Sequence, residues 1–318
     1  MGVRRNILSS TQARDEYLDG VLELSRLKTG LMASDVYRFL RNIVPNFRMA
    51  GRDQELSYYD LIVVWHTAAM GLQVPPGNAA HGAPIFLPWH RMYLILLEQW
   101  LQTILGNPNF GLPYWDWAED GELPRSEQWR TDLWSASYLG EARGEVISGR
   151  VGGMEVRLQS DRSGTIQSIR PQPLTREAGR DRDFRSLPDQ ADVQNAIQET
   201  NYDQSPWSRS STGGHRNNLE GWLDGPRLHN LVHIWIGGDM GPSTSPNDPA
   251  FFLNHCNVDR IWEAWMSQHG QIYQPVGNEG PAGHRLNDTM FAILGDALTP
   301  AEVLDVSERY TYDSLIVH

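Results

Sequence analysis

The sequence predicts a mainly α-helical protein, in which a core of four helices is joined by long surface loops with little β-structure. Apolar residues recur at helical spacing in four stretches, and start and stop signals for helices frame each of them. Each stretch also contains histidine, and the histidines form two groups from opposite halves of the chain. Because the two groups must meet, we expect residues 1–318 to form one domain, with an irregular loop region at about 121–214.

Two helices are expected before the first histidine group. Residues 10–28 are predicted to form an exposed amphipathic helix rich in both kinds of charge. Ser34 and Asp35 are predicted to cap a second helix, which runs through Val44 and stops at Pro45.

The first histidine group begins on a helix. Ser57 and Asp60 have the spacing of a capping box that opens this helix, and Gly71 closes it. His66 lies on its apolar run. Residues 72–88 are rich in proline and glycine and therefore predict a loop.

His81 falls in this loop. Pro88 is predicted to begin a strongly apolar helix that ends at Gly106 and carries His90 in its first turn. Three histidines therefore come from two helices and the loop between them.

The second histidine group shows the same arrangement. His229 and His233 stand four residues apart, so a helix places them on one face, about 6 Å apart along its axis. This helix stops at the glycines of residues 237–238. Residues 248–249 then read as an N-cap aspartate and a first-turn proline, and they start a helix that carries His255.

The two groups predict two metal sites made of nitrogen ligands. Imidazole suits copper, zinc, iron and nickel. Neither group shows the H-E-x-x-H pattern of a zinc protease. A zinc hydrolase more usually shows a carboxylate ligand or base nearby. The ligand chemistry therefore favours a pair of copper ions, with a dinuclear zinc hydrolase as the alternative.

Motifs around these histidines recur in order over roughly residues 35 to 313. They are H-G-A-P-I-F-L-P-W-H-R (81–91), P-Y-W-D-W (113–117), L-E-G-W-L-D-G-P-R-L-H-N-L-V-H (219–233), S-P-N-D-P-A-F-F-L-N-H (245–255), V-D-R-I-W (258–262) and Y-T-Y-D (310–313). These motifs resemble those of the type 3 copper proteins, specifically the bacterial tyrosinases. The resemblance implies that one copper ion is bound by His66, His81 and His90. A second copper ion would be bound by His229, His233 and His255.

The resemblance also implies a reaction. The protein would use O2 as a co-substrate to hydroxylate monophenols at the ortho position and to oxidise o-diphenols to o-quinones. An o-aminophenol oxidase, or a catechol oxidase without efficient monophenol hydroxylation, is the alternative. A less favoured alternative is an oxygen carrier similar to the haemocyanins. Bacterial relatives often use a small helper protein that loads copper, so such a partner is expected.

Two further residues have a role that the resemblance implies. In similar tyrosinases, a Glu and an Asn at the positions of Glu220 and Asn230 hold a water that takes the phenol proton. A phenol with a pKa near 10 must lose this proton to bind copper, and a carboxylate that polarises water is a suitable base. In the structural alternative, Glu220 pairs with Arg216 or Arg227, and Asn230 caps backbone groups.

The substrate pocket is expected beside the second histidine group. Ile234 and the loop of residues 241–245, which includes Ser243, are predicted to line its mouth. Relatives often carry a second histidine where this chain has Asn254. This departure bears on substrate placement, whereas the ligand position His255 is unchanged.

Several other residues are predicted to be structural. Asp259 is expected to form a salt bridge, and Cys256 to be a small buried residue. Asp116 is expected to bond locally or to orient a histidine. Residues 149–162 predict a short hairpin. Surface or loop positions are expected for the remaining histidines: His215, His269, His284 and His318.

Composition excludes some classes of function. The net charge of −12 argues against a nucleic-acid surface, which needs a basic patch. No apolar run approaches the ~20 residues of a membrane span. Arg4 and Arg5 are followed by no apolar signal core, so we expect a cytoplasmic protein unless a partner exports it.

Overall fold

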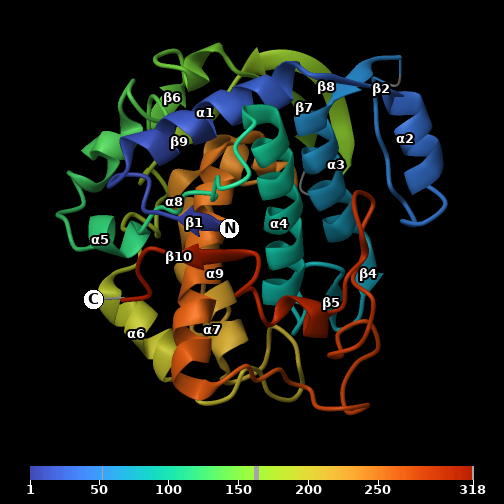
Figure 1. The fold of residues 1–318 in the computed structure, drawn as a ribbon, viewed down its shortest axis with the longest axis vertical. Helices are drawn as coiled ribbons and strands as arrows, with labels where there is room; N and C mark the ends of the chain where they lie inside the picture. Colours follow the sequence, from blue (N-terminus) through green and yellow to red (C-terminus); the bar gives the residue numbers. More distant parts are fainter. Residues whose placement is uncertain (52, 161–164, 317–318) are drawn as a thin grey trace.

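Four helices form the core of the computed structural model, which describes residues 1–51, 53–160 and 165–316. In Figure 1, α4 and α9 lie side by side at the centre, with α3 beside α4. Trp65 of α3 packs edge-on against Trp89 and Tyr93 of α4. The predicted mainly helical fold with a four-helix core is confirmed. These core helices are α3 (Tyr58–Gly71), α4 (Phe86–Leu105), α8 (Leu228–Ile236) and α9 (Ala250–His269).

Shorter helices surround this core. α1 packs across α3 and α4. The α-helices outside the core are α1 (Thr11–Arg26), α2 (Ala33–Leu40), α5 (Trp117–Gly121), α6 (Gln190–Gln198) and α7 (His215–Glu220). The 3-10 helices are Gln128–Arg130, Asp132–Trp134, Val151–Gly153, Gly238–Met240, Ser245–Asn247 and Pro300–Val303.

The β-structure of the described chain consists of two-stranded pairs, each of which ties two segments together. The parallel pair is β1 (Gly2–Arg4) with β10 (Tyr310–Tyr312), in which Gly2 lies opposite Tyr310. The antiparallel pairs are β2 (Lys28–Met32) with β3 (Glu55–Ser57), β4 (Gln73–Val74) with β5 (Gly77–Asn78), β6 (Arg143–Glu145) with β9 (Thr175–Glu177), and β7 (Glu155–Ser160) with β8 (Ile166–Pro173). No pair forms a layer of the core.

Local signals set the ends of the core helices. The hydroxyl of Ser57 accepts from the amide of Asp60 at 3.0 Å, and the Asp60 carboxylate accepts from the Ser57 amide at 2.8 Å. This capping box confirms the predicted start of α3. α4 ends at Gly106, whose φ of 61° lies in the left-handed region that glycine favours. However, α4 begins at Phe86 and not at Pro88, so His90 lies in its second turn.

Three predictions on other elements need correction. The first helix buries one face, including Tyr17 and Leu24, and is therefore not simply exposed. α2 ends at Leu40 and not at Val44, and its N-cap residue makes no side-chain bond. The predicted hairpin contains β7, but its partner β8 lies beyond it, and residues 161–164 are outside the described residues.

A buried ion-pair network supports the back of α4 and α9. The Asp259 carboxylate accepts from Arg91 at 2.6 Å and from Arg4 at 3.1 Å. The hydroxyls of Tyr310 and Tyr312 donate to the same carboxylate, each at 2.6 Å. The network joins β1, β10, α4 and α9, so the structural role predicted for Asp259 is confirmed.

Asp116 belongs to a second buried ion pair. Its carboxylate accepts from Arg260 at 2.7 Å. It therefore holds the chain after residue 113 against α9, and it does not orient a ligand histidine. Cys256 is buried and free, as predicted.

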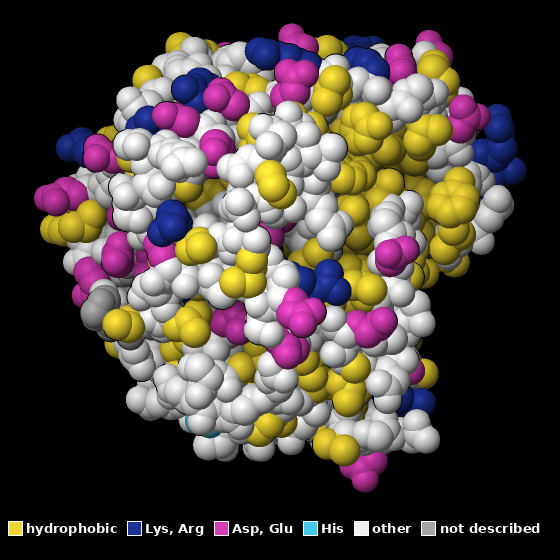
Figure 2. Space-filling model, in the orientation of Figure 1, with side chains coloured by type: hydrophobic (Ala, Val, Ile, Leu, Met, Phe, Trp, Pro, Cys, Tyr) yellow, Lys and Arg dark blue, Asp and Glu magenta, His cyan; other side chains and the backbone are white. Residues whose placement is uncertain are grey.

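Part of the surface is apolar. Figure 2 shows hydrophobic side chains gathered at the upper right, over the region between α2 and α3. Phe39 on α2 and Ile43 just after it are exposed, and α2 contacts the rest of the molecule mainly through β2. None of the helices in the described ranges is both long and apolar enough to cross a membrane.

Candidate metal centre

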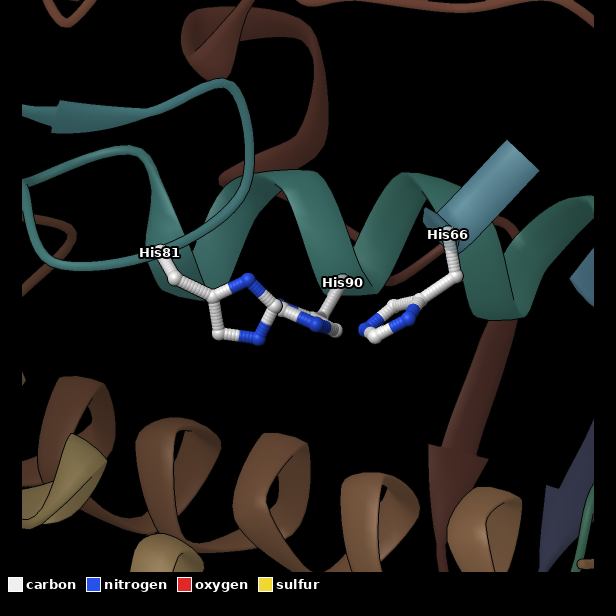
Figure 3. A group of neighbouring side chains, drawn as sticks. All are labelled: His66, His81 and His90. Atoms are coloured by element: carbon white, nitrogen blue, oxygen red, sulfur yellow. The ribbon is translucent and has the colours of Figure 1, made fainter. Parts of the chain in front are cut away.

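The first triad consists of His66 from α3, His81 from the loop after β5, and His90 from α4. Figure 3 shows their rings approaching one another beneath α4, and their ligand atoms lie within 4.8 Å of one another. Nδ1 of His66 donates to the carbonyl of Ser243 at 2.7 Å, and Nδ1 of His90 to the carbonyl of Phe86 at 2.8 Å. These bonds place the proton on Nδ1, so that Nε2 keeps a free lone pair. Both Nε2 atoms are buried without a partner in the described structure.

Hydrogen bonds to two side chains, one from β5 and one from α7, hold the loop that carries His81. The side-chain oxygen of Asn78 accepts from the amides of Ala80 at 3.0 Å and His81 at 2.7 Å. The next amide, of Gly82, donates to the Glu220 carboxylate at 2.7 Å. The position of His81 therefore depends on Asn78 and Glu220, which come from different parts of the chain.

The second triad consists of His229 and His233 from α8 and His255 from α9. Nε2 of His255 lies 3.2 Å from Nε2 of His229 and 3.5 Å from Nε2 of His233. Two ligands at ~2.0–2.1 Å from a tetrahedral metal lie about 3.3 Å apart, so this spacing fits one ion. Nδ1 of His233 donates to the carbonyl of Met240 at 2.8 Å, which directs its Nε2 to the site.

Glu220 and Asn230 lie directly behind the second triad. Nδ1 of His229 faces the side-chain oxygen of Asn230 at 3.1 Å and the carbonyl of Glu220 at 3.3 Å. The Glu220 carboxylate is fully buried and accepts from Arg216 at 3.1 Å. Asn230 also donates to the carbonyl of Gly221 at 3.3 Å. The ion pair with Arg216, which the sequence left as an alternative, is thus present.

The two triads face each other across one small space. The rings of His90 and His255 stack with centroids 4.2 Å apart, and those of His81 and His229 lie 6.1 Å apart. The ring of Phe251 packs beside His255 at 4.1 Å. Two ions held by these triads would therefore share the space between them, against an apolar wall.

Burial keeps the six imidazoles neutral. It lowers the pKa of His66 to about 3 and that of His233 to about 4, because the charged form would lose its hydration. Burial, followed by repulsion from neighbouring imidazoles, lowers the pKa of the other four well below 6.5. A neutral imidazole has the lone pair that binds a metal, so both triads are in the ligand form.

Comparison with known proteins identifies the family of this site. The model of the tyrosinase family, described as the common central domain of tyrosinase, matches residues 56–268 and so covers both triads. The chain belongs to the tyrosinase family. It is a copper-dependent phenol oxidase whose dinuclear copper centre these triads fit.

Individual relatives are similar over most of their length. The tyrosinase of Streptomyces glaucescens is 35% identical over 289 residues, which cover 89% of this chain and 96% of that protein. The grixazone synthase of Streptomyces griseus is 35% identical over 263 residues, or 73% and 81% of the two chains. The structure of a polyphenol oxidase from Thermothelomyces thermophila has a TM-score of 0.70 at 21% identity, and covers 99% of this chain and 89% of that one. The last similarity shows a shared fold.

A cavity of about 260 Å³ opens beside the copper-binding triads of this tyrosinase-family protein. His66, His81, His229 and His233 reach it, together with the polar side chains of Arg209 and Asn230. Its apolar wall contains Met70, Trp222, Pro226, Ile234 and Pro242. The cavity can therefore hold an aromatic ring between apolar side chains, with one end at the metal site.

Ile234 lines this tyrosinase cavity, as predicted, whereas Ser243 and Asn254 do not. The predicted loop of residues 241–245 reaches the cavity through Gly241, Pro242 and Ser245. The hydroxyl of Ser243 turns away to that of Ser160 at 2.9 Å. Asn254 is fully buried, and it precedes His255 on α9. Because neighbouring helical residues point about 100° apart, a ligand at 255 turns Asn254 away from the site.

The sequence did not single out several residues of the tyrosinase cavity. Arg209 stands outside the histidine patterns, and no local signal indicates its position. Met70 lies four residues after His66 on α3, so helix spacing already places both on one face. Pro226 lies in the motif of residues 219–233. Trp222 lies in the L-E-G-W motif and could have been noted there. Arg209 reaches the cavity through loop geometry, which spacing in the sequence does not reveal.

Two other histidines are more buried than predicted. His215 is fully buried and stacks on Trp265 with centroids 4.8 Å apart. His284 is buried as well, and its Nε2 lies 2.7 Å from the carbonyl of Val74. His215 fills a structural position on α7, whereas His284 lies in a loop, as predicted, but is buried there. His269 is partly buried at the end of α9, and His318 lies outside the described residues.

Proposed function

We propose that this protein acts as a tyrosinase, which hydroxylates monophenols ortho to their hydroxyl group and oxidises o-diphenols to o-quinones with O2. The observation that carries the proposal is the pair of neutral histidine triads facing each other beside an aromatic-sized cavity. One copper ion would be held by His66, His81 and His90, and the other by His229, His233 and His255. When bound, the two copper ions supply the activation of O2 and the transfer of electrons from the phenol.

The residues of the chain have three tasks in this reaction. The apolar wall, including Ile234 and Pro242, holds the aromatic ring and keeps bulk water from the metal site. The backbone carbonyls behind His66, His90 and His233 fix the direction of each ring. These contacts place the phenol oxygen at the triads before any bond changes.

The third task is to remove the phenol proton. We propose that Glu220 and Asn230 hold the water that accepts it. Asn230 lines the cavity, and Glu220 lies behind it with a fully buried carboxylate. The ion pair with Arg216 keeps this carboxylate in place. A buried, oriented acceptor of this kind is suited to general-base catalysis.

An o-aminophenol oxidase or a catechol oxidase is the alternative. One relative is a grixazone synthase rather than a tyrosinase, although it is as similar in identity as the Streptomyces glaucescens protein. We propose that side chains of the cavity wall, such as Ile234, decide between these activities.

A metal analysis followed by a substrate panel tests the proposal. We expect two copper ions per chain, and initial rates on tyrosine and on a catechol that both depend on copper. Turnover of a catechol or an o-aminophenol without tyrosine hydroxylation would favour the alternative. Reversible O2 uptake without phenol oxidation would favour an oxygen carrier, and zinc in place of copper would overturn the proposal.

We also propose that a small helper protein loads the copper, as in the bacterial tyrosinases that this sequence resembles. Both triads are largely buried, so copper must pass through the cavity to reach them. Copper content after expression with and without a candidate helper protein would test this partner. Equal copper content in both preparations would exclude the need for it.

A further inference from the structure

The cavity beside the triads has a cationic rim. Among the described residues that line it, Arg209 is the only one with a formally charged side chain. Apart from the metal-binding histidines, the rest of the lining is apolar or uncharged. A lone cation at the entrance stands out in a chain whose net charge is −12.

Contacts on two sides position this side chain. The guanidinium carbon of Arg209 lies 4.4 Å from the ring centroid of Trp222, which also lines the cavity. The Arg209 side chain also lies against Gly82. A Cβ atom at position 82 would come within 2.7 Å of the Arg209 Nε, which is too close. Gly82 follows the ligand His81 directly, and its φ of 74° also favours glycine. The lack of a side chain at Gly82 thus lets the guanidinium lie close to the metal site.

The charge of Arg209 is not neutralised within the protein. None of the ion pairs that join described residues includes it. Two arginines nearby in sequence differ in this respect. Arg216 pairs with Asp203 and Glu220, and Arg227 pairs with Asp192. Arg209 is therefore free to pair with a ligand.

We propose that Arg209 binds the carboxylate of phenols that carry an acid group on the substituent para to the hydroxyl, such as 3-(4-hydroxyphenyl)propanoate. The inference rests on the proposed function, in which the hydroxyl end of the substrate faces the triads. A para substituent then points away from the metals and toward the rim. Guanidinium groups bind carboxylates through two parallel hydrogen bonds, which makes arginine well suited to this task.

The remaining side chains at the cavity do not provide this preference. Met70, Pro226 and Ile234 contact any aromatic ring without regard to its charge. Asn230 is uncharged and lies on the side of the second triad. Discrimination between an acid and its neutral amide is therefore assigned to Arg209.

The test compares an acid with its amide in variants of Arg209. The o-diphenol pair 3-(3,4-dihydroxyphenyl)propanoate and its amide is used, so that the result does not depend on monophenol hydroxylation. In R209Q we expect the ratio of kcat/KM for acid over amide to fall roughly three- to fivefold, the range of an exposed ion pair. The fall should lie in KM rather than in kcat, since Arg209 binds the part of the substrate that does not react.

Reversal of the charge at position 209 and a change of ionic strength provide two further measurements of the acid-to-amide ratio. R209E should lower the ratio further and should favour an amine such as dopamine over the acid. The matched control is R125E, which makes the same change of charge at an exposed arginine outside the cavity, and it should leave the ratio unchanged. In the wild-type protein, the ratio should decline as ionic strength rises, because salt screens an exposed pair.

An acid-to-amide ratio that is the same in R209Q and wild type would overturn the inference. Failure of the proposed function is a separate result, in which the wild-type copper protein oxidises neither compound. In that event, calorimetric binding of acid and amide to the wild-type and R209Q proteins gives the same comparison without turnover. Equal affinities of the two proteins for the acid would then overturn the inference.

Discussion

The second triad takes all its histidines from two helices, whereas the first triad takes His81 from a loop. In the second triad, helix geometry alone brings His229 and His233 to one face, and α9 adds His255 at 3.2–3.5 Å. In the first triad, Asn78 and Glu220 must hold the loop through hydrogen bonds. One metal site therefore depends mainly on secondary structure, and the other depends on contacts between distant segments.

The largest effect should follow from removing a ligand from either triad. We expect that His90→Ala in the first triad and His233→Ala in the second both reduce activity to background, since both ions must act on one O2. Copper content should fall below two per chain. Atomic absorption and catechol oxidation measure both outcomes, and full activity in either variant would show that the triads are not a joint site.

Replacing Glu220 tests the residue that contacts both triads. Its carboxylate accepts from Gly82 in the loop of the first triad, and its carbonyl faces His229 of the second. Glu220→Gln keeps an acceptor for the Gly82 amide but loses the charge beside Arg216. We expect monophenol turnover to fall by roughly 10²-fold and diphenol turnover much less, because only the monophenol step needs a general base. Equal losses would remove this role for Glu220.

The dependence of the first triad on its loop can be broken at Asn78. Asn78→Ala removes the acceptor of the Ala80 and His81 amides. We expect the copper affinity of the first triad to fall by roughly 10–100-fold, as for other contacts that orient ligands, while the second triad keeps its ion. Titration with a chelator measures the release of each ion.

A matched control exists at Asn107, which accepts from the amide of Asn109 in a similar turn far from the cavity. Asn107→Ala should leave both copper affinities unchanged. If Asn78→Ala instead lowered the copper affinity of both triads equally, the first triad would not depend specifically on the hydrogen bonds of Asn78 to its loop.

The smallest expected effect is a difference in protonation between the triads when the pH of the copper-free protein is lowered. The pKa of His233, which is partly exposed, is lowered to about 4, and that of the more buried His66 to about 3. Both values lie below the ordinary 6.5, so the unfolded chain binds more protons, and the free energy of unfolding falls as the pH drops below 6.5. Imidazole NMR should show His233 taking its proton first. The reverse order would contradict this difference in burial.

Local patterns predicted the helices of the core well. The capping box of Ser57 and Asp60 and the stop at Gly106 each act over one turn of helix, so the sequence shows them directly. The end of α2 at Leu40 was missed, as was the pairing of β7 with β8, because these depend on packing with other segments. The buried position of His215 was missed for the same reason, since it rests on stacking against Trp265 of α9.

The sequence by itself determined the six histidines of the metal centre and the helices that carry five of them, because spacing and helix signals are local properties. Only the tertiary structure decided the rest of the site. It placed Arg209 beside Trp222 at the cavity, turned Ser243 away from it, and paired Glu220 with Arg216. The direction of a side chain on a loop depends on neighbours that are distant in sequence, and these neighbours are set only when the chain has folded.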